Sequence, residues 1–228
     1  RKNMLSVIIF LPLLVGIIVL FIPKTSPRII RWAGFLGSFV PLLLTLWLWF
    51  GYDPAGPELQ WKTVAPWIPP VGAQYFIAVD GISLPLLVLT ALLFTLAMVY
   101  VLPQYERAKE HAFLFLLMET GLLGLFSARD LLLFYLFFEV GLVPMYFIIA
   151  MFGHENRLYA AIKFFLYTRA GSLFMLLSFL GLYLSTEPHT FSLPAIVEAQ
   201  PLAGRPVAAA LAVIGMIIGF GVKLPVVP

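Results

Sequence analysis

Seven long apolar stretches divide this sequence, and each is long enough for a helix to cross a membrane. They cover approximately residues 4–22, 30–50, 82–102, 111–128, 131–151, 158–184 and 207 to the last residue. About 20 predominantly apolar residues in a helix span roughly 30 Å of hydrocarbon. Hydrophobic residues make up 62% of the chain and charged residues 11%, whereas soluble domains have about one half and about one quarter. We therefore expect an all-α, polytopic transmembrane helix bundle.

Lysines and arginines in the short connections predict the orientation of such a bundle. If the basic turn at 23–29 is cytoplasmic, the basic residues inside are Lys24, Arg28, Arg31, Arg107, Lys109 and Arg157. Those outside are then Arg1, Lys2, Lys62, Arg129 and Arg205. The small excess inside predicts an outside (periplasmic) N-terminus, with the long connections 51–80 and 185–206 on the same side. The first of these is rich in proline and tryptophan, and we expect a packed surface loop at the membrane interface.

Composition excludes several classes of function. The chain has no cysteine, so disulfides and thiolate metal sites are excluded, and its three histidines are far apart in sequence, which argues against a metal cluster. The basic residues are scattered, and there is neither a P-loop nor a GxGxxG motif. We expect no nucleic-acid partner, and no metal or cofactor on this chain.

One carboxylate, Glu139, interrupts the fifth apolar stretch in the segment FYLFFEVGLVPMY (134–146). It follows Asp130 by nine residues, which at about 1.5 Å per residue is roughly 13 Å into the span. Its helical neighbours are uncharged, so a partner must come from another helix, and Pro144 frees a carbonyl near residue 140. A charge at this depth costs at least about 2.5 kcal/mol. We interpret Glu139 as a proton-relay carboxylate; the alternative is a structural hydrogen bond between helices.

Two further charges lie deep in apolar stretches. Glu119 in LFLLMETGLLG is a candidate for the same network, although the neighbouring Thr120 and Gly121 also indicate close helix packing. Lys223 stands among glycines and prolines in GFGVKLPVVP, where we expect a broken helix lining a polar cavity. A lysine there can take up and release a proton; the alternative is a lysine that extends from the helix end towards water.

Three other residues have weaker signals. Lys163 lies near the start of the sixth stretch and is either a proton carrier or a lysine that extends to the interface. Arg169 lies deeper and cannot release its proton, but it can hold a carboxylate ionised. Asp80, which precedes Ser83 and Pro85, is predicted to cap the third helix.

Four blocks in this order resemble a known family: VDGISLPLLVLT (79–90), LLLFYLFFEVGLVPMYFIIAMFG (131–153), AAIKFFLYTRAGSLFMLL (160–177) and GFGVKLPVVP (219–228). They are similar to the antiporter-like membrane subunits of respiratory complex I, the proton-translocating NADH:quinone oxidoreductase, and most similar to subunit M. The same blocks are typical of the large subunits of multisubunit cation/proton antiporters.

This resemblance implies a fold of about fourteen helices with two inverted five-helix repeats. Residues 1–110 would hold the three leading helices and a periplasmic loop, and 111–228 helices four to seven, cut short in the broken seventh helix. Glu139 and Lys223 would form the central pair of a half-channel, with Glu119 as the carboxylate typical of subunit M and Lys163 as a further proton-translocating residue. Arg169 departs from the family pattern, which usually has an uncharged residue there.

The resemblance also implies partners: the other membrane subunits of complex I, including neighbouring antiporter-like subunits, in the lipid bilayer of a bacterial inner membrane. Flavin, iron–sulfur clusters and quinone would be bound by those partners, since this chain has no signature for them.

Three alternatives come from other classes of protein. The chain could belong to a cation/proton antiporter, which residues 1–228 do not exclude. It could be a structural subunit whose charges only lock helices together. A retinal protein with a Schiff base at Lys223 fits poorly, because such a pump needs carboxylates in its third helix and residues 84–102 contain none.

Overall fold

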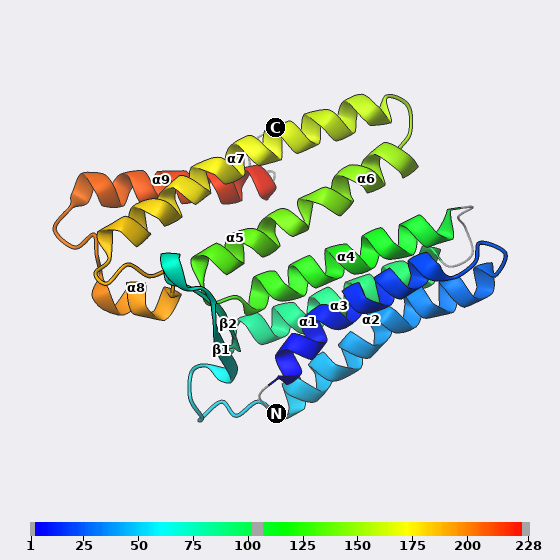
Figure 1. Ribbon diagram of the computed structural model, residues 1–228, viewed down its shortest axis with the longest axis horizontal. Coiled ribbons are helices and arrows are strands. Elements are labelled where there is room, and N and C mark those ends of the chain that lie inside the picture. The colour runs from blue at the N-terminus through cyan, green and yellow to red at the C-terminus, as the bar shows by residue number, and fades with distance from the viewer. Residues whose placement is uncertain (1–2, 102–106, 225–228) are drawn as a thin grey trace. The chain divides into compact units, whose positions relative to one another are not determined.

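The computed structural model describes residues 3–101 and 107–224, and most of them are helical (Figure 1). The long helices are α1 (Met4–Phe21), α2 (Pro27–Phe50), α3 (Ser83–Val101), α4 (Ala108–Ser127), α7 (Arg157–Ser185) and α9 (Pro206–Lys223). A further span consists of α5 (Leu131–Val140) and α6 (Leu142–Phe152). Within the described residues, seven segments are thus long and apolar enough to cross a membrane. The predicted seven stretches and their order are confirmed, and the chain is an integral membrane protein.

The connection 51–80, for which we predicted a packed surface loop, contains regular secondary structure. It forms a two-stranded sheet of β1 (Gln60–Ile68) and β2 (Ala73–Val79), joined by the 3-10 turn η1 (Pro69–Val71). The prolines fit this hairpin because two of them form the turn, and a two-stranded sheet has only edge strands, where a missing N–H is tolerated. Gly72 follows the turn with a φ of 65°, a left-handed conformation that suits glycine. The second long connection contains the short helix α8 (Leu193–Ala199).

Asp80 caps α3, as predicted. Its carboxylate accepts hydrogen bonds from the backbone N–H groups of Ile82 and Ser83, at 3.0 and 2.7 Å. In return, the Ser83 hydroxyl accepts the backbone N–H of Asp80 at 2.9 Å. This reciprocal pair is a capping box with serine in place of the usual glutamate.

The chain divides into two compact units. The first comprises residues 1–63, 77–128 and 136–148, and the second comprises 64–76, 129–135 and 149–228. Our predicted division at residue 110 follows the family's helix numbering rather than contacts, and it stays a prediction.

Small residues bring the helices of the first unit close together. Its apolar core joins four helices through Val19, Ile30, Met98, Ala112 and Leu116. On α2, a Cβ at Gly34 would lie 3.2 Å from the Ala112 Cβ, and one at Gly37 would lie 2.8 Å from a Val15 methyl. Since helices in lipid gain no hydrophobic effect from pairing, such close approach supplies the packing that holds them.

Packing between α7 and α9 dominates the second unit, where the two helices run alongside each other (Figure 1). Gly171 lies against Val222, and Gly219 lies against Met175. A Cβ at Gly215 would collide with the Ser178 hydroxyl and lie 2.7 Å from the Phe174 carbonyl oxygen. Gly215 and Gly219 therefore serve close helix contact, and the helix continues through both Gly219 and Gly221. The break that we predicted around Lys223 stays a prediction. The helix ends at Lys223, and the prolines at 225 and 228 lie outside the described residues.

Asp130 ties together three segments of the second unit. Its carboxylate caps α5 by accepting the backbone N–H groups of Leu132 and Leu133, at 3.0 and 3.1 Å. Its other oxygen accepts the backbone N–H of Gln74 at 3.0 Å, at the start of β2. The Leu131 N–H donates to the Phe191 carbonyl at 2.8 Å, which adds the segment before α8. These hydrogen bonds therefore hold the first turn of α5, the helix that contains Glu139, against β2 and the segment before α8.

We predict that the same substitution has opposite effects at two glycines of the second unit. Gly215→Ala forces a methyl group against the Phe174 carbonyl and should destabilise the protein by about 1–3 kcal/mol. Gly181→Ala on α7 has no described atom within 4 Å, so it should be neutral or stabilise by up to about 1 kcal/mol through helix propensity. Thermal unfolding of the purified variants in detergent measures both, and equal effects would contradict the packing.

We also predict a pH-dependent contribution from Asp130. Burial raises the pKa of its carboxyl above the usual value, against three backbone N–H bonds that lower it. An acid whose pKa is higher in the folded state binds its proton more tightly there than in the unfolded chain. The free energy of unfolding therefore falls as the pH rises from about 4, the unfolded pKa, through the folded pKa. The wild type should therefore lose stability relative to Asp130→Asn as the pH rises from about 4 through the pKa of the folded state. A difference in unfolding temperature that stays constant or grows with pH would contradict this.

Candidate functional site

The most deeply buried charge in the described residues is Glu119, on α4 in the first unit. Its side chain is 0% exposed. Neither carboxyl oxygen has a hydrogen bond of acceptable geometry within the part of the chain that the structure describes. The Ser38 side chain on α2 is close enough to interact with the carboxyl. An ionised carboxylate that is buried without a partner costs several kcal/mol.

Glu139 lies at the end of α5, in the first unit, and is half-buried. The span is interrupted directly after it: α5 ends at Val140 and α6 begins at Leu142. The Gly141 N–H still reaches the Phe137 carbonyl, at 3.3 Å. We had predicted that Pro144, which lacks a backbone N–H, frees a carbonyl near residue 140. The interruption lies there, in the turn before that proline. Broken helices at membrane depth typically line polar cavities.

The helices of the two carboxylates cross at a pair of glycines. A Cβ at Gly121 would lie 3.2 Å from the Gly141 nitrogen and 3.4 Å from its Cα. Each glycine follows one of the two glutamates by two residues, Glu119 and Glu139 respectively. The next turn of α4 brings Gly124 against the Phe137 ring. The first unit therefore brings together the helix segments that contain its two predicted carboxylates.

The predicted basic residues belong to the second unit. Lys223 is half-buried in the last turn of α9. Lys163 is exposed on α7, and its ammonium lies 5.8 Å from the centre of the Tyr159 ring, one turn earlier. Arg169 is also exposed on α7. Since Glu139 and Lys223 lie in different units, their pairing stays a prediction, as does each residue's role.

Sequence reasoning missed three polar residues next to these elements: Ser38, Thr95 and Asp130. Ser38 and Thr95 are hydroxyl residues in apolar stretches, where such residues usually bond to their own helix. The signal in the sequence was the run Gly34, Gly37, Ser38, whose spacing places small residues on one face of a helix. Asp130 served only as the boundary of a span, although its place directly before an apolar run is typical of a cap.

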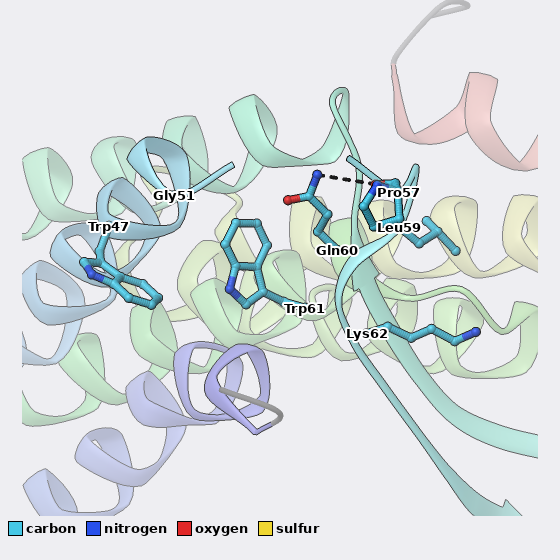
Figure 2. A pocket seen from close by; sticks show the side chains of 7 residues that line it. All are labelled: Trp47, Gly51, Pro57, Leu59, Gln60, Trp61 and Lys62. Carbon is cyan, nitrogen blue, oxygen red and sulfur yellow. Dashed lines mark hydrogen bonds between the residues drawn. The ribbon is translucent and has the colours of Figure 1, made fainter. Parts of the chain in front are cut away.

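A polar hollow of the first unit lies elsewhere, at the end of α2. Trp47, Gly51, Pro57, Leu59, Gln60, Trp61 and Lys62 line a cavity of about 450 Å³. Figure 2 shows the indoles of Trp47 and Trp61 on one side of it and Lys62 pointing away from them. The Gln60 amide is occupied by the Asp53 and Pro57 carbonyls, at 2.6 and 3.3 Å. None of the predicted site residues lines this cavity.

Comparison with known proteins identifies the architecture. Residues 128–228 match the family described as NADH:quinone oxidoreductase/Mrp antiporter, transmembrane. A chain of respiratory complex I from Thermus thermophilus with bound NADH superposes with a TM-score of 0.82 at 31% identity, over 97% of this chain and 44% of that one. A chain of the Mrp complex from Dietzia sp. DQ12-45-1b has a TM-score of 0.81 at 19% identity, over 96% and 23%. The second likeness shows the fold alone.

Similar curated sequences have related names. NAD(P)H-quinone oxidoreductase chain 4 of Gloeobacter violaceus is 37% identical over 225 residues, which are 98% of this chain and 42% of that protein. NADH-quinone oxidoreductase subunit M of Rhodobacter capsulatus is 40% identical over 187 residues, 80% of this chain and 36% of that protein. The chain thus spans less than half the length of these relatives.

The predicted resemblance is confirmed by the matched family, by relatives along almost the whole chain and by the shared fold. The chain belongs to the antiporter-like membrane subunits that complex I shares with the Mrp antiporters, and it corresponds to roughly their N-terminal half.

Proposed function

We propose that the chain is part of a proton-translocating membrane subunit of an NADH:quinone oxidoreductase. The observation that supports this most is Glu119, a carboxylate with 0% exposure inside a helix of membrane length. The relatives named above support the enzyme class. The proton would move through a half-channel centred on Glu139 and Lys223, with Glu119 in the same network and Lys163 further along.

The chemistry needs only groups that gain and lose protons. While a protonated Lys223 lies next to an ionised Glu139, each stabilises the charge of the other. If Glu139 turns to another partner, the ammonium loses its counter-ion and passes its proton on. Arg169 cannot take such a part because a guanidinium does not deprotonate in proteins.

On this proposal the chain performs no electron transfer. The drive would come from partner subunits that hold flavin, iron–sulfur clusters and quinone, and the chain would contact other membrane subunits, including antiporter-like neighbours. The family resemblance supports a bacterial inner membrane. The basic residues in the short connections support an N-terminus on the periplasmic side.

A cation/proton antiporter subunit is the second candidate, and the fold shared with the Dietzia complex favours it. The identities of 37% and 40% to oxidoreductase subunits, against 19% to the Mrp chain, favour the first. Sodium-driven proton movement in vesicles without NADH would decide for the antiporter.

We predict that Glu139→Gln abolishes proton movement through this subunit while the complex still assembles. Glutamine has almost the same shape and bonds neighbouring helices, but it cannot release a proton. The measurement is the number of protons pumped per NADH oxidised in membrane vesicles, normalised to the amount of assembled complex. An unchanged ratio would reduce Glu139 to a residue for helix packing, and failed assembly would support the structural-subunit alternative.

A further inference from the structure

Three polar side chains from three helices meet inside the first unit. Ser38 on α2 and Glu119 on α4 are each 0% exposed, and Thr95 on α3 is 5% exposed. Most of their sequence neighbours are apolar or glycine, although Thr120, directly after Glu119, is a further buried hydroxyl. Nothing in the sequence relates them, since they lie in separate apolar stretches.

The Thr95 hydroxyl is held by the backbone. It lies 2.8 Å from the Ala91 carbonyl oxygen, one turn earlier, and 3.2 Å from the Ser38 carbonyl oxygen. The Ser38 hydroxyl lies 3.4 Å from the Thr95 hydroxyl oxygen. Because Thr95 has a single proton and donates it to a carbonyl, its oxygen is left to accept a hydrogen bond from Ser38.

The Ser38 side chain is also close enough to the Glu119 carboxyl to interact with it. The carboxyl oxygens have no completed hydrogen bond in the described residues. A rotation of the Ser38 hydroxyl therefore decides what the carboxyl can bond. Ser38 thus has two possible partners. The Thr95 oxygen can always accept a hydrogen bond, whereas the Glu119 carboxyl accepts or donates according to whether it is ionised or protonated.

A carboxyl group reverses its bonding role when it titrates. The ionised form only accepts hydrogen bonds, whereas the protonated form donates one. A serine hydroxyl can donate and accept, so it suits both forms: it donates to the carboxylate, or it accepts from the protonated acid while its own proton turns to Thr95. A lysine or an amide N–H in the same place could donate to a carboxyl oxygen, but it could not accept the hydrogen bond of the protonated acid.

We propose that Ser38 and Thr95 form a hydroxyl switch that lets Glu119 change its charge inside the membrane. Ser38 is a positioning residue for the proton on Glu119, and Thr95 accepts the Ser38 hydrogen bond when Glu119 is protonated. No covalent bond changes and no net proton moves along the hydroxyls. The inference rests on the proposed function, because a switch matters only if Glu119 gains and loses a proton.

The matched control is Thr45, another buried hydroxyl on α2. It is 0% exposed, and its hydroxyl donates to the Leu42 carbonyl of its own helix at 2.9 Å. Thr45→Val therefore removes a buried hydroxyl from the same helix without touching Glu119. Ser38→Ala removes one oxygen and adds no volume, and Thr95→Val keeps the shape of the side chain.

The experiment measures each variant in the intact complex with two readouts. Infrared spectroscopy follows the carboxyl C=O band that disappears in Glu119→Gln, and vesicle assays give protons pumped per NADH oxidised. Ser38→Ala should shift that band to higher wavenumber, through the lost hydrogen bond, and lower the proton ratio. Thr95→Val should shift it less, and Thr45→Val should leave both readouts at wild-type values.

The outcomes distinguish failure of the hydroxyl switch from failure of the proposed proton translocation. If Glu119→Gln pumps normally, the role of Glu119 in the proposed function fails. If Glu119→Gln loses pumping while Ser38→Ala and Thr95→Val behave like Thr45→Val in both readouts, the switch alone is overturned. If Ser38→Ala does not assemble, Thr95→Val decides: an unshifted band overturns the switch, and a shifted band supports it.

Discussion

The cost of placing a charge in hydrocarbon constrains this structure more than any other interaction. Hydrocarbon constrains the backbone in the same way. Within the described residues, each segment of membrane length is helical, because a helix satisfies its own N–H and C=O groups. A side-chain carboxylate has no such internal partner. Glu119 is nevertheless enclosed completely, and a hydroxyl, that of Ser38, is close enough to interact with it. A group that only held helices together would be better served by an amide, so the enclosed acid is more consistent with proton chemistry.

Glycines determine how closely the helices, and the polar side chains on them, can approach each other. Gly37 admits side chains of α1 and α4 to α2, and Gly121 meets the backbone at Gly141, where the fifth span is broken. The same principle joins α7 to α9 in the second unit through Gly215 and Gly219. Because lipid offers helices no hydrophobic reason to associate, these close contacts are what hold polar groups such as Ser38 at bonding distance from neighbouring helices.

The sequence predicted the helices well because hydrocarbon thickness imposes a length that apolar stretches reveal directly. It predicted the cap at Asp80 from local residue types, and the family from four blocks. It failed at residues 60–79, where prolines suggested a loop although edge strands and a turn accommodate them. It also gave no sign that Gly219 packs closely against Met175. The partners of Glu119 could not be predicted, since Ser38 and Thr95 come from separate stretches and only packing brings them together.

The central claim is that the buried charges of this chain exchange protons. Lys223→Arg tests it most directly, because arginine keeps the positive charge and the capacity to pair with a carboxylate but cannot release its proton. The measurement is protons pumped per NADH oxidised in vesicles that contain equal amounts of assembled complex. The account predicts normal assembly with a lowered ratio. A wild-type ratio in Lys223→Arg would contradict it and leave Lys223 as a fixed charge that only stabilises the fold.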